Sequence, residues 1–469
     1  MTMLDDTIAA ISTPLGEGGI GIVRLSGKDS IPIVEKLFLS PKGKKIGESE
    51  SHRLTYGFIK NPFAGTTIDE VLVSVMKAPN TYTKEDIVEI NCHGGILAMR
   101  KVLELALQHG ARLAEPGEFT KRAFLNGRID LSQAEAVIDL IRAKTEESGK
   151  IALEQLSGGL SEKITGLRDR LLSVCAHIEA YIDFPEDEIE PASMDRILNE
   201  VQDIKESLLA LSKSFEEGRF FREGLRVAIV GRPNVGKSSL LNALLKRDRA
   251  IVTEIAGTTR DVLEEYLNIK GLPTRIMDTA GIRETHEMAE KEGVIRSLRA
   301  IDDADVVIGV MDGTCSLHDE DMVVLEKMRD KKSIVVVNKS DLSTVESLET
   351  HLGVYSENLL KISAKTGVGL DMLKEKILEV SMVRSRKSEV GTTLDEGAGV
   401  IVTNIRHKMA IDNAVSALNN GASALTASLP LEVVAVEMRD ALDRLGELVG
   451  SVTTEDILNR IFSEFCIGK

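Results

Sequence analysis

The sequence has no tryptophan, and aromatic residues make up only 3% of its 469 positions. Proteins that bind single-stranded nucleic acid stack bases on aromatic side chains, so this scarcity argues against that mode of binding. No apolar run approaches the roughly 20 residues that cross a bilayer, and the N-terminus lacks the basic and then apolar segments of a signal peptide. We therefore expect a cytosolic protein with no membrane partner.

Cysteine is also rare. The sequence has four cysteines, which lie far apart without C-x-x-C spacing: Cys92, Cys175, Cys315 and Cys466. A disulfide framework or a zinc site needs cysteines in closely spaced groups. The spacing therefore predicts neither, and buried cysteines that act as small apolar side chains are expected for the first three.

Positive charge is in deficit, because the formal net charge is −16. Residues 1–130 carry equal numbers of acidic and basic side chains, so the whole deficit lies in the remainder. The charge distribution therefore does not predict a strongly basic surface for nucleic acid. If RNA is a substrate, a partner supplies most of the phosphate contacts.

The chain is long enough for two to four domains. Its first part is β-rich, with short strand-like runs at 8–12, 21–25, 71–75 and 87–90 and one helix over 96–108.

From Leu131 the apolar spacing becomes helical and stays so to about Phe215, opening on a capping box over Ser132–Glu135. Strands then alternate with helices over about 225–380, and from about 400 the chain is helical again.

Two helical segments thus flank one α/β segment, and each has an apolar face to bury. Packing them together makes the α/β segment an insertion, which is tolerated because domain termini are often close in space. The sequence predicts a multidomain protein of α/β and α+β class. We expect a β-rich N-terminal domain, a discontinuous all-α domain in two parts and an inserted α/β domain, over residues 1–125, 126–216 with 384–469, and 217–383.

Residues Gly231–Ser238 read GRPNVGKS, a complete phosphate-binding loop. Such a loop supplies backbone N–H groups for phosphates, a lysine for the β- and γ-oxygens and a hydroxyl for Mg²⁺. A strand-like run over 225–230 precedes it and a helical run over 239–245 follows, which is the context that the motif requires. The pattern predicts a nucleotide site with Lys237 and Ser238 on the phosphates and the metal.

Two further motifs follow predicted strands. In Asp278-Thr-Ala-Gly281, Asp278 can reach Mg²⁺ through water and Gly281 can approach the γ-phosphate. In Asn338-Lys-Ser-Asp341, the Asp341 carboxylate can accept from the ring N–H and the amine of guanine, whereas adenine offers no such pair. The second motif therefore predicts GTP rather than ATP.

Together these motifs resemble the Ras-like P-loop GTPase domain. The predicted GTP-binding residues form four groups along the chain: Asn234, Val235, Gly236, Lys237, Ser238 and Ser239; Thr253, Glu254, Ile255, Ala256, Gly257, Thr258 and Thr259; Asp278, Thr279, Ala280 and Gly281; and Asn338, Lys339, Asp341, Ser363, Ala364 and Lys365.

The hydrolytic machinery differs from that of small Ras-like GTPases, because Ile282 stands where they place a water-orienting glutamine. The amide of Asn234 and the segment Thr253–Asp261 could instead hold a monovalent cation against the phosphates. Thr259 could complete the Mg²⁺ shell. The residues alone do not choose a water-orienting group among Glu284, Glu287, Glu290 and Glu292.

Four segments together resemble the MnmE (TrmE) family of tRNA-modification GTPases: Gly231–Ser238, Gly257–Asp261, Asp183–Glu188 and Phe465–Lys469. The resemblance implies a potassium-activated GTPase that modifies the wobble uridine of tRNA. It implies a homodimer that acts with the FAD- and NADH-dependent MnmG (GidA) in a heterotetramer or larger complex. The added group, aminomethyl or carboxymethylaminomethyl, draws on a one-carbon unit of a tetrahydrofolate derivative, either 5-formyl or methylene.

The family's functional residues transfer to matching positions. The resemblance assigns K⁺ to Asn234, Thr253, Ile255 and Thr258, Mg²⁺ to Ser238 and Thr259, and water orientation to Glu290. It makes the N-terminal domain the unit of dimerisation and folate binding, with Arg24, Glu89, Arg128 and Lys469 on the folate. Arg128 departs from relatives that carry lysine there, and Cys466 matches a C-terminal cysteine that could act in the one-carbon chemistry.

Two other classes of GTPase compete with this interpretation. One is a regulatory ribosome-assembly GTPase whose flanking domains bind rRNA, against which the neutral N-terminus and acidic remainder argue. The other is a membrane-fission or transport GTPase, which would need an amphipathic or spanning anchor that the sequence lacks.

Overall fold

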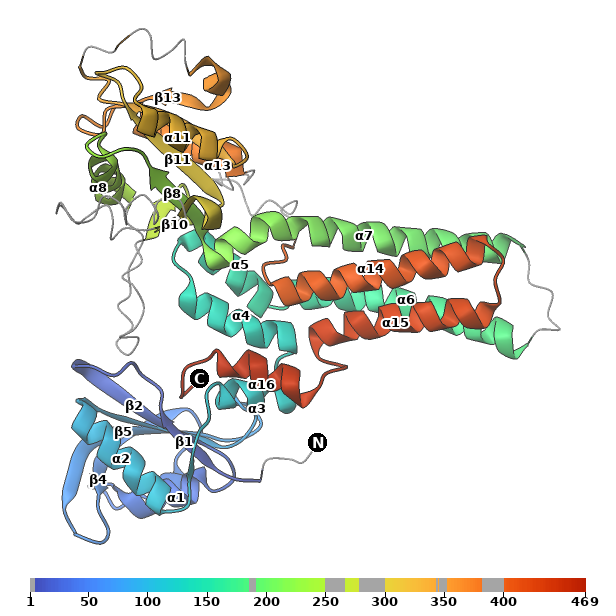
Figure 1. Ribbon diagram of the computed structural model, residues 1–469. Helices are drawn as coiled ribbons and strands as arrows, with labels where there is room; N and C mark the ends of the chain where they lie inside the picture. Colours follow the sequence, from blue (N-terminus) through green and yellow to red (C-terminus); the bar gives the residue numbers. More distant parts are fainter. Residues whose placement is uncertain are drawn as a thin grey trace, which may run out of the picture. The chain divides into compact units, whose positions relative to one another are not determined.

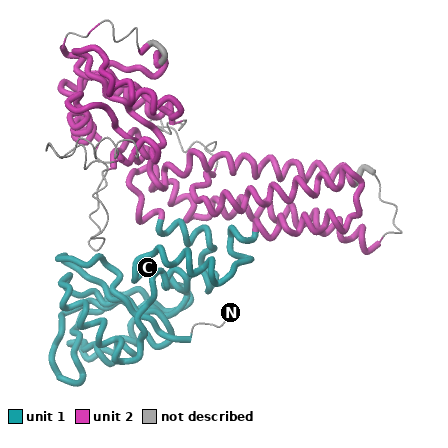
Figure 2. Tube along the Cα trace, in the orientation of Figure 1, with its two compact units in different colours: residues 1–138, 254–260, 446–469 teal, residues 139–253, 261–445 magenta. Residues whose placement is uncertain are grey.

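The computed structural model describes residues 5–184, 191–248, 266–277, 300–342, 345, 352–381 and 400–469. The chain forms two compact units, of residues 1–138, 254–260 and 446–469 and of residues 139–253 and 261–445 (Figure 2). In the described helices, no stretch is long and apolar enough to cross a membrane.

The first unit is built on a seven-stranded sheet of order β3-β4-β5-β6-β2-β1-β7 (Figure 1). Most neighbours are antiparallel, and β1 with β7 is a parallel pair. The strands span Ile8–Ile11, Gly18–Ser26, Phe38–Leu39, Arg53–Lys60, Thr67–Met76, Ile87–Gly94 and Arg112–Leu113 for β1 to β7.

Helices cover one face of this sheet and part of the other. The core packs α1 and α2 against alternate residues such as Val71, Val73 and Val75. A smaller apolar cluster sets Phe119 of α3 against Ile8 and Ala10 of β1, on the opposite face. The helices are α1 (Ser30–Leu37), α2 (Ile96–Gln108), α3 (Glu118–Leu125) and α16 (Glu455–Ser463), with the 3-10 turn η1 (Ile46–Glu48).

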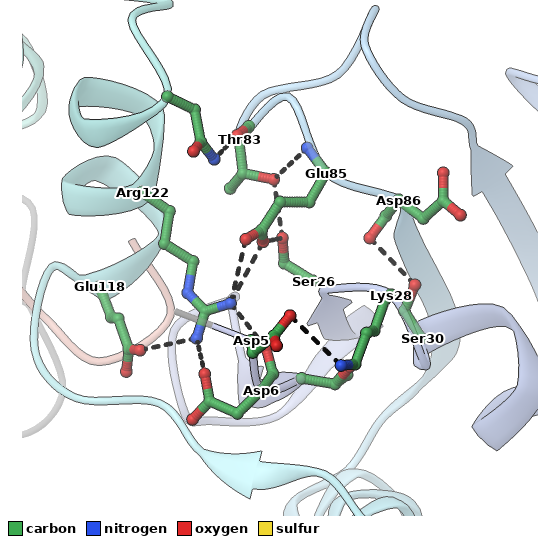
Figure 3. Close-up of polar contacts among 12 residues, drawn as sticks. Asp5, Asp6, Ser26, Lys28, Ser30, Thr83, Glu85, Asp86, Glu118 and Arg122 are labelled. Atoms are coloured by element: carbon green, nitrogen blue, oxygen red, sulfur yellow. Dashed lines mark hydrogen bonds and ion pairs between the residues drawn. The ribbon is translucent and has the colours of Figure 1, made fainter. Parts of the chain in front are cut away.

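A buried charged cluster fixes α3 to the sheet. Arg122 is 1% exposed, and its guanidinium bonds to Asp6, Glu85 and Glu118 at 2.6–3.2 Å (Figure 3). The Glu85 carboxylate also accepts from the Ser26 hydroxyl at 2.7 Å. A buried arginine needs such partners because removing a lone charge from water costs several kcal/mol, about the stability of a small domain.

The end of the chain is held in the same unit. The Phe119 N–H donates to the Lys469 carbonyl at 3.2 Å, and Pro116 bridges to Ile467. Gly468 has φ of 99°, and a Cβ there would lie 2.3 Å from the Ile11 carbonyl oxygen. The close approach of the tail to β1 therefore requires glycine.

The second unit contains a six-stranded sheet of order β13-β12-β11-β8-β10-β9. All neighbours are parallel except β9, which is antiparallel to β10. The strands β8 to β13 span Leu225–Val230, Tyr266–Ile269, Leu272–Met277, Val306–Asp312, Ser333–Asn338 and Leu359–Lys361. Two apolar clusters cover the two faces, as both faces of a parallel sheet require. The helices and turn are α8 (Lys237–Asp248), α11 (Asp319–Met328), α13 (Leu370–Ser381) and η2 (Gly353–Asn358).

A helical bundle completes this unit (Figure 1). Ser212 of α7 donates to Asp412 of α14, and Arg439 of α15 pairs with Glu179 of α6. Its elements are α4 (Leu131–Arg142), α5 (Glu146–Leu156), α6 (Gly159–Asp183), α7 (Pro191–Glu223), α14 (Ile405–Thr426) and α15 (Leu431–Val449), of which α4 and α15 continue into the first unit. The helical segments before and after the α/β sheet thus pack together, as their apolar faces predicted.

Three local expectations were wrong. The reciprocal cap of α4 lies at Asp130 and Gln133, because their side chains each accept the other's N–H at 2.9 Å, so the capping box over Ser132–Glu135 does not form. Ser132 and Glu135 are instead buried in the helix. Helix α7 runs past Phe215 because Phe220 and Phe221 extend its apolar face into the α/β core.

The third concerns the α/β segment, where strands do not alternate strictly with helices. Strand β9 pairs Tyr266–Ile269 antiparallel to β10 through the short turn at Lys270 and Gly271, both with positive φ. The predicted alternation of strand and helix did not include this hairpin.

Candidate functional site: a guanine nucleotide site

The phosphate loop joins β8 to α8, at the carboxyl ends of the parallel strands. Its shape depends on residues with positive φ: Gly231 at 151°, Asn234 at 65° and Gly236 at 100°. A Cβ at Gly231 would lie 2.4 Å from the Val310 carbonyl oxygen, so no other residue fits there. Asparagine tolerates the left-handed region better than most side chains do.

Lys237 opens α8 and is oriented by the loop itself. Its ammonium donates to the carbonyls of Gly231 at 2.8 Å and Arg232 at 2.9 Å. Burial lowers its pKa from the ordinary value. The loop thus holds a desolvated cation beside the α8 N-terminus, where phosphate oxygens are favoured.

Asn338 connects the phosphate loop to the guanine segment. Its side-chain amide donates to the Val235 carbonyl at 2.8 Å, and its side-chain carbonyl accepts from the Ala364 N–H at 3.0 Å. Asn338 is 2% exposed, so both bonds are shielded from water. It therefore fixes three predicted nucleotide-binding segments relative to one another.

The other residues of that segment sit at the surface of the site. The Lys339 ammonium pairs with the Asp312 carboxylate at 2.5 Å. Asp341 is exposed and accepts from the Ser363 hydroxyl at 2.7 Å, which lowers the pKa of its carboxyl. An ionised, oriented and accessible carboxylate is what the recognition of guanine requires.

The remaining predicted residues divide by position. Ser238, Ser239 and Lys365 lie in or beside this site: the two serines are exposed in the first turn of α8, and Lys365 follows Ala364. The segments 253–261, 278–282 and 284–292 lie outside the described residues. The predicted roles of Thr253, Glu254, Ile255, Ala256, Gly257, Thr258, Thr259, Asp278, Thr279, Ala280, Gly281, Ile282 and Glu290 therefore stay predictions.

Magnesium fits the residues present. In the described part of the chain no group of three His, Cys, Asp or Glu side chains could hold a metal ion by itself. Mg²⁺ at nucleotide sites takes one or two protein oxygens, with the rest of its shell from phosphates and water. The exposed hydroxyl of Ser238, one residue after Lys237, suits that role.

A second set of predicted residues meets in the first unit. Arg24 of β2 and Glu89 of β6 are register partners and form an ion pair of 2.7 Å. The Arg24 guanidinium lies 5.6 Å from the centre of the Phe119 ring, and Phe119 bonds to Lys469. Arg24, paired with Glu89, thus lies near Phe119, and the backbone N–H of Phe119 holds the carbonyl of Lys469 in the same region.

Arg128, the fourth member of this set, joins it through a neighbouring ring. Its guanidinium lies 4.6 Å from the centre of the Tyr82 ring, and the Tyr82 hydroxyl bonds to Thr120 of α3 at 3.0 Å. Cys466 is exposed, and its carbonyl accepts from the Gly117 N–H at 3.4 Å.

The sequence analysis did not single out Phe119, Tyr82 or Asp312. Phe119 and Tyr82 carry no spacing signal, because they approach Arg24 and Arg128 through tertiary packing. Asp312 ends a strand of the parallel sheet, and a carboxylate at a strand end near a nucleotide motif is a signal that could have been used.

Taken together, the loop over 231–238 and the oriented carboxylate of Asp341 define a guanine-nucleotide-binding protein of the P-loop class. Similarity to known proteins narrows this class to one family. The family model described as MnmE helical domain matches residues 131–466, and the one described as GTP-binding protein TrmE N-terminus matches residues 7–128.

Full-length relatives agree. The tRNA modification GTPase MnmE of Acetivibrio thermocellus is 48% identical over 466 residues, 99% of each chain. That of Carboxydothermus hydrogenoformans is 48% identical over 471 residues, covering 100% of each. The chain belongs to the MnmE family of tRNA modification GTPases. It is a GTP hydrolase that acts in tRNA modification, and its family uses GTP with Mg²⁺.

Proposed function

We propose that this chain is a K⁺-activated GTPase that works with MnmG (GidA), an FAD enzyme, to modify the wobble uridine of tRNA. The observation that best supports cation activation is the accessibility of the Asn234 side chain. It is exposed in the phosphate loop, and its amide forms no hydrogen bond with the residues that the structure describes. An available carbonyl oxygen is a suitable ligand for a hard cation.

The division of roles follows the family match. Asn234 would hold K⁺ with Thr253, Ile255 and Thr258. Bound K⁺ would supply positive charge against the phosphates, as an arginine finger does in other GTPases. Ser238 and Thr259 would hold Mg²⁺, Lys237 would bind the β- and γ-oxygens, and Glu290 would orient the attacking water.

The first unit is the proposed folate site. Arg24, Arg128 and Lys469 carry positive charge, which suits the glutamate carboxylates of a tetrahydrofolate derivative. The rings of Phe119 and Tyr82 lie beside the two arginines. Glu89 can accept from ring N–H groups of a pterin, as carboxylates do with such donors. The site would present a one-carbon unit from 5-formyl- or methylene-tetrahydrofolate. The exposed thiol of Cys466 would lie near this unit and could take part in its transfer.

A homodimer through the first unit is part of the proposal. Register places Tyr56, Leu72 and Ile22 on one face of the sheet, in a row with Asn91. Tyr56 and Leu72 are 47% and 41% exposed, and Leu54 and Ile20 add to the apolar surface of β4 and β2. A sheet face of this kind is stabilised when a second copy covers it.

The partner and the compartment follow from the reaction. The formal net charge of −16 does not favour binding of nucleic acid by this chain alone, so MnmG would supply most contacts to tRNA in a heterotetramer or larger assembly. Hydrolysis of GTP in the second unit would drive the rearrangement that the modification needs. We propose that the complex works in the cytosol, where tRNA and folate are available.

Nucleoside analysis of tRNA tests this proposal. Cells that lack the protein should lose aminomethyl and carboxymethylaminomethyl groups at the wobble uridine. The wild-type gene should restore them, and a gene carrying Lys237→Ala should not. Unchanged wobble nucleosides in the deletion strain would refute the proposal.

A further inference from the structure

Arg232, the second residue of the phosphate loop, is held by two side chains, one from the turn after β11 and one from α11. Its Nε donates to the Asp321 carboxylate at 3.2 Å, and its Nη2 donates to the Cys315 sulfur at 2.8 Å. The Arg232 side chain is 17% exposed and that of Asp321 is 2% exposed. This contact is therefore largely dry, unlike a surface ion pair.

Asp321, which accepts from Arg232, is itself held in place. The same oxygen of Asp321 that accepts from Arg232 also accepts from the His318 N–H at 3.0 Å, in the capping box of α11. The other carboxylate oxygen is buried, and no described residue gives it a hydrogen bond. Asp321 is thus fixed by the first turn of α11.

Cys315, the other partner of Arg232, is connected through Asp312 to the guanine motif. Cys315 lies in the turn that follows β11, and its thiol is 3.8 Å from the Asp312 carbonyl oxygen. The Asp312 carboxylate in turn pairs with Lys339 at 2.5 Å. One short turn therefore contacts both Arg232 of the phosphate loop and Lys339 of the guanine motif.

We propose that Arg232 is a positioning residue for GTP binding. Its clamped side chain fixes the orientation of its own backbone carbonyl, and that carbonyl is one of the two that aim the Lys237 ammonium. Arg232 need not touch the nucleotide. Its effect passes through Lys237 to the β- and γ-phosphates, so it raises affinity for GDP and GTP.

Two variants separate positioning from mere stability. Arg232→Ala leaves the buried Asp321 carboxylate without its cationic partner, so it should lower the Tm of the nucleotide-free protein. It should also raise the Kd for GDP and GTP roughly tenfold, because the Lys237 ammonium is no longer oriented for one charged hydrogen bond to phosphate. The double variant Arg232→Met with Asp321→Asn removes both charges, and asparagine can still cap α11. We expect its Tm to recover while both Kd values stay raised.

Binding of fluorescent GDP and GTP analogues to the full chain measures Kd. Thermal unfolding of the nucleotide-free chain measures Tm. Arg329→Ala is the matched control, since Arg329 is exposed just after α11 and forms no ion pair with described residues. It should leave Kd unchanged. If Kd recovers together with Tm in the double variant, or if Arg329→Ala raises Kd as much as Arg232→Ala, the proposal is wrong.

Discussion

The Ser363 hydroxyl donates to the Asp341 carboxylate at 2.7 Å, across two loops that are 22 residues apart in the sequence. This bond lowers the pKa of Asp341, so the carboxylate is ionised at neutral pH. One of its oxygens is oriented by Ser363, while the side chain remains exposed. We propose that the two residues together set the hydrogen-bonding pattern that a guanine base would meet.

Asp341→Asn should change which base is bound. An amide offers a donor where the carboxylate offers only acceptors, so it matches a base with a carbonyl in place of the guanine amine. We expect GTP affinity to fall by roughly 100-fold or more, and xanthosine triphosphate to bind better than GTP. Competition binding against a fluorescent GDP analogue measures both. Preserved guanine preference in the variant would show that Asp341 does not read the base.

Potassium should control the rate of hydrolysis. Replacing K⁺ with Na⁺ at constant ionic strength should cut GTP turnover at least about tenfold, since one positive charge near the phosphates is worth several kcal/mol in the transition state. Asn234→Ala should lower turnover in K⁺ to the Na⁺ level and leave GDP affinity within about threefold. Lys365 and the guanine motif stay intact in this variant, so binding serves as the internal control. Equal rates of the wild type in the two salts contradict the proposal.

The folate proposal predicts a separable loss in the first unit. Arg24→Ala should abolish binding of 5-formyl-tetrahydrofolate in calorimetry and leave GTP turnover unchanged, because the GTP site lies in the other unit. Arg53→Ala is the control. Its guanidinium pairs with Glu50 on the surface at 3.1 Å and should not matter for folate. Full folate affinity in Arg24→Ala would remove Arg24 from the site.

His93 should titrate above its ordinary pKa of about 6.5. Its ring nitrogen bonds to the Asp69 carboxylate at 2.6 Å, and this hydrogen bond, with the charge of Asp69, raises the pKa of His93. A raised folded pKa adds stability that is fully present below the unfolded pKa and is lost as the pH rises through the folded value.

NMR titration of the His93 ring checks this directly. Asp69→Asn should return the pKa toward the ordinary value, and the stability difference between wild type and His93→Gln should shrink as the pH rises. A His93 pKa that is the same in wild type and Asp69→Asn would exclude Asp69 as its cause.

Much of the nucleotide site could be predicted from sequence because its parts are local. Gly231–Ser238 and Asn338–Asp341 each follow a buried strand, and the carboxyl ends of parallel strands meet at one edge of a sheet. Local spacing also predicted α2 at its observed bounds, Ile96–Gln108. It misplaced the cap of α4, because Ser132 and Asp130 are both good caps and burial decided between them.

The residues of the first unit could not be placed by spacing alone. Arg24 and Lys469 lie at opposite ends of the chain, and only the packing of α3 and the tail against the sheet brings both to Phe119. The resemblance to a family named them, yet neither Phe119 nor Tyr82 followed from it.

Motifs in the sequence were enough to assign the nucleotide class and the alternation of helical and α/β segments, because phosphate and guanine recognition depend on short runs of backbone and side chain. Tertiary structure decided what holds those runs in place. The bonds from Asn338 to Val235 and from Arg232 to Asp321 join residues 103 and 89 positions apart. Such bonds form only when the strands and helices have packed and the water between them has been excluded.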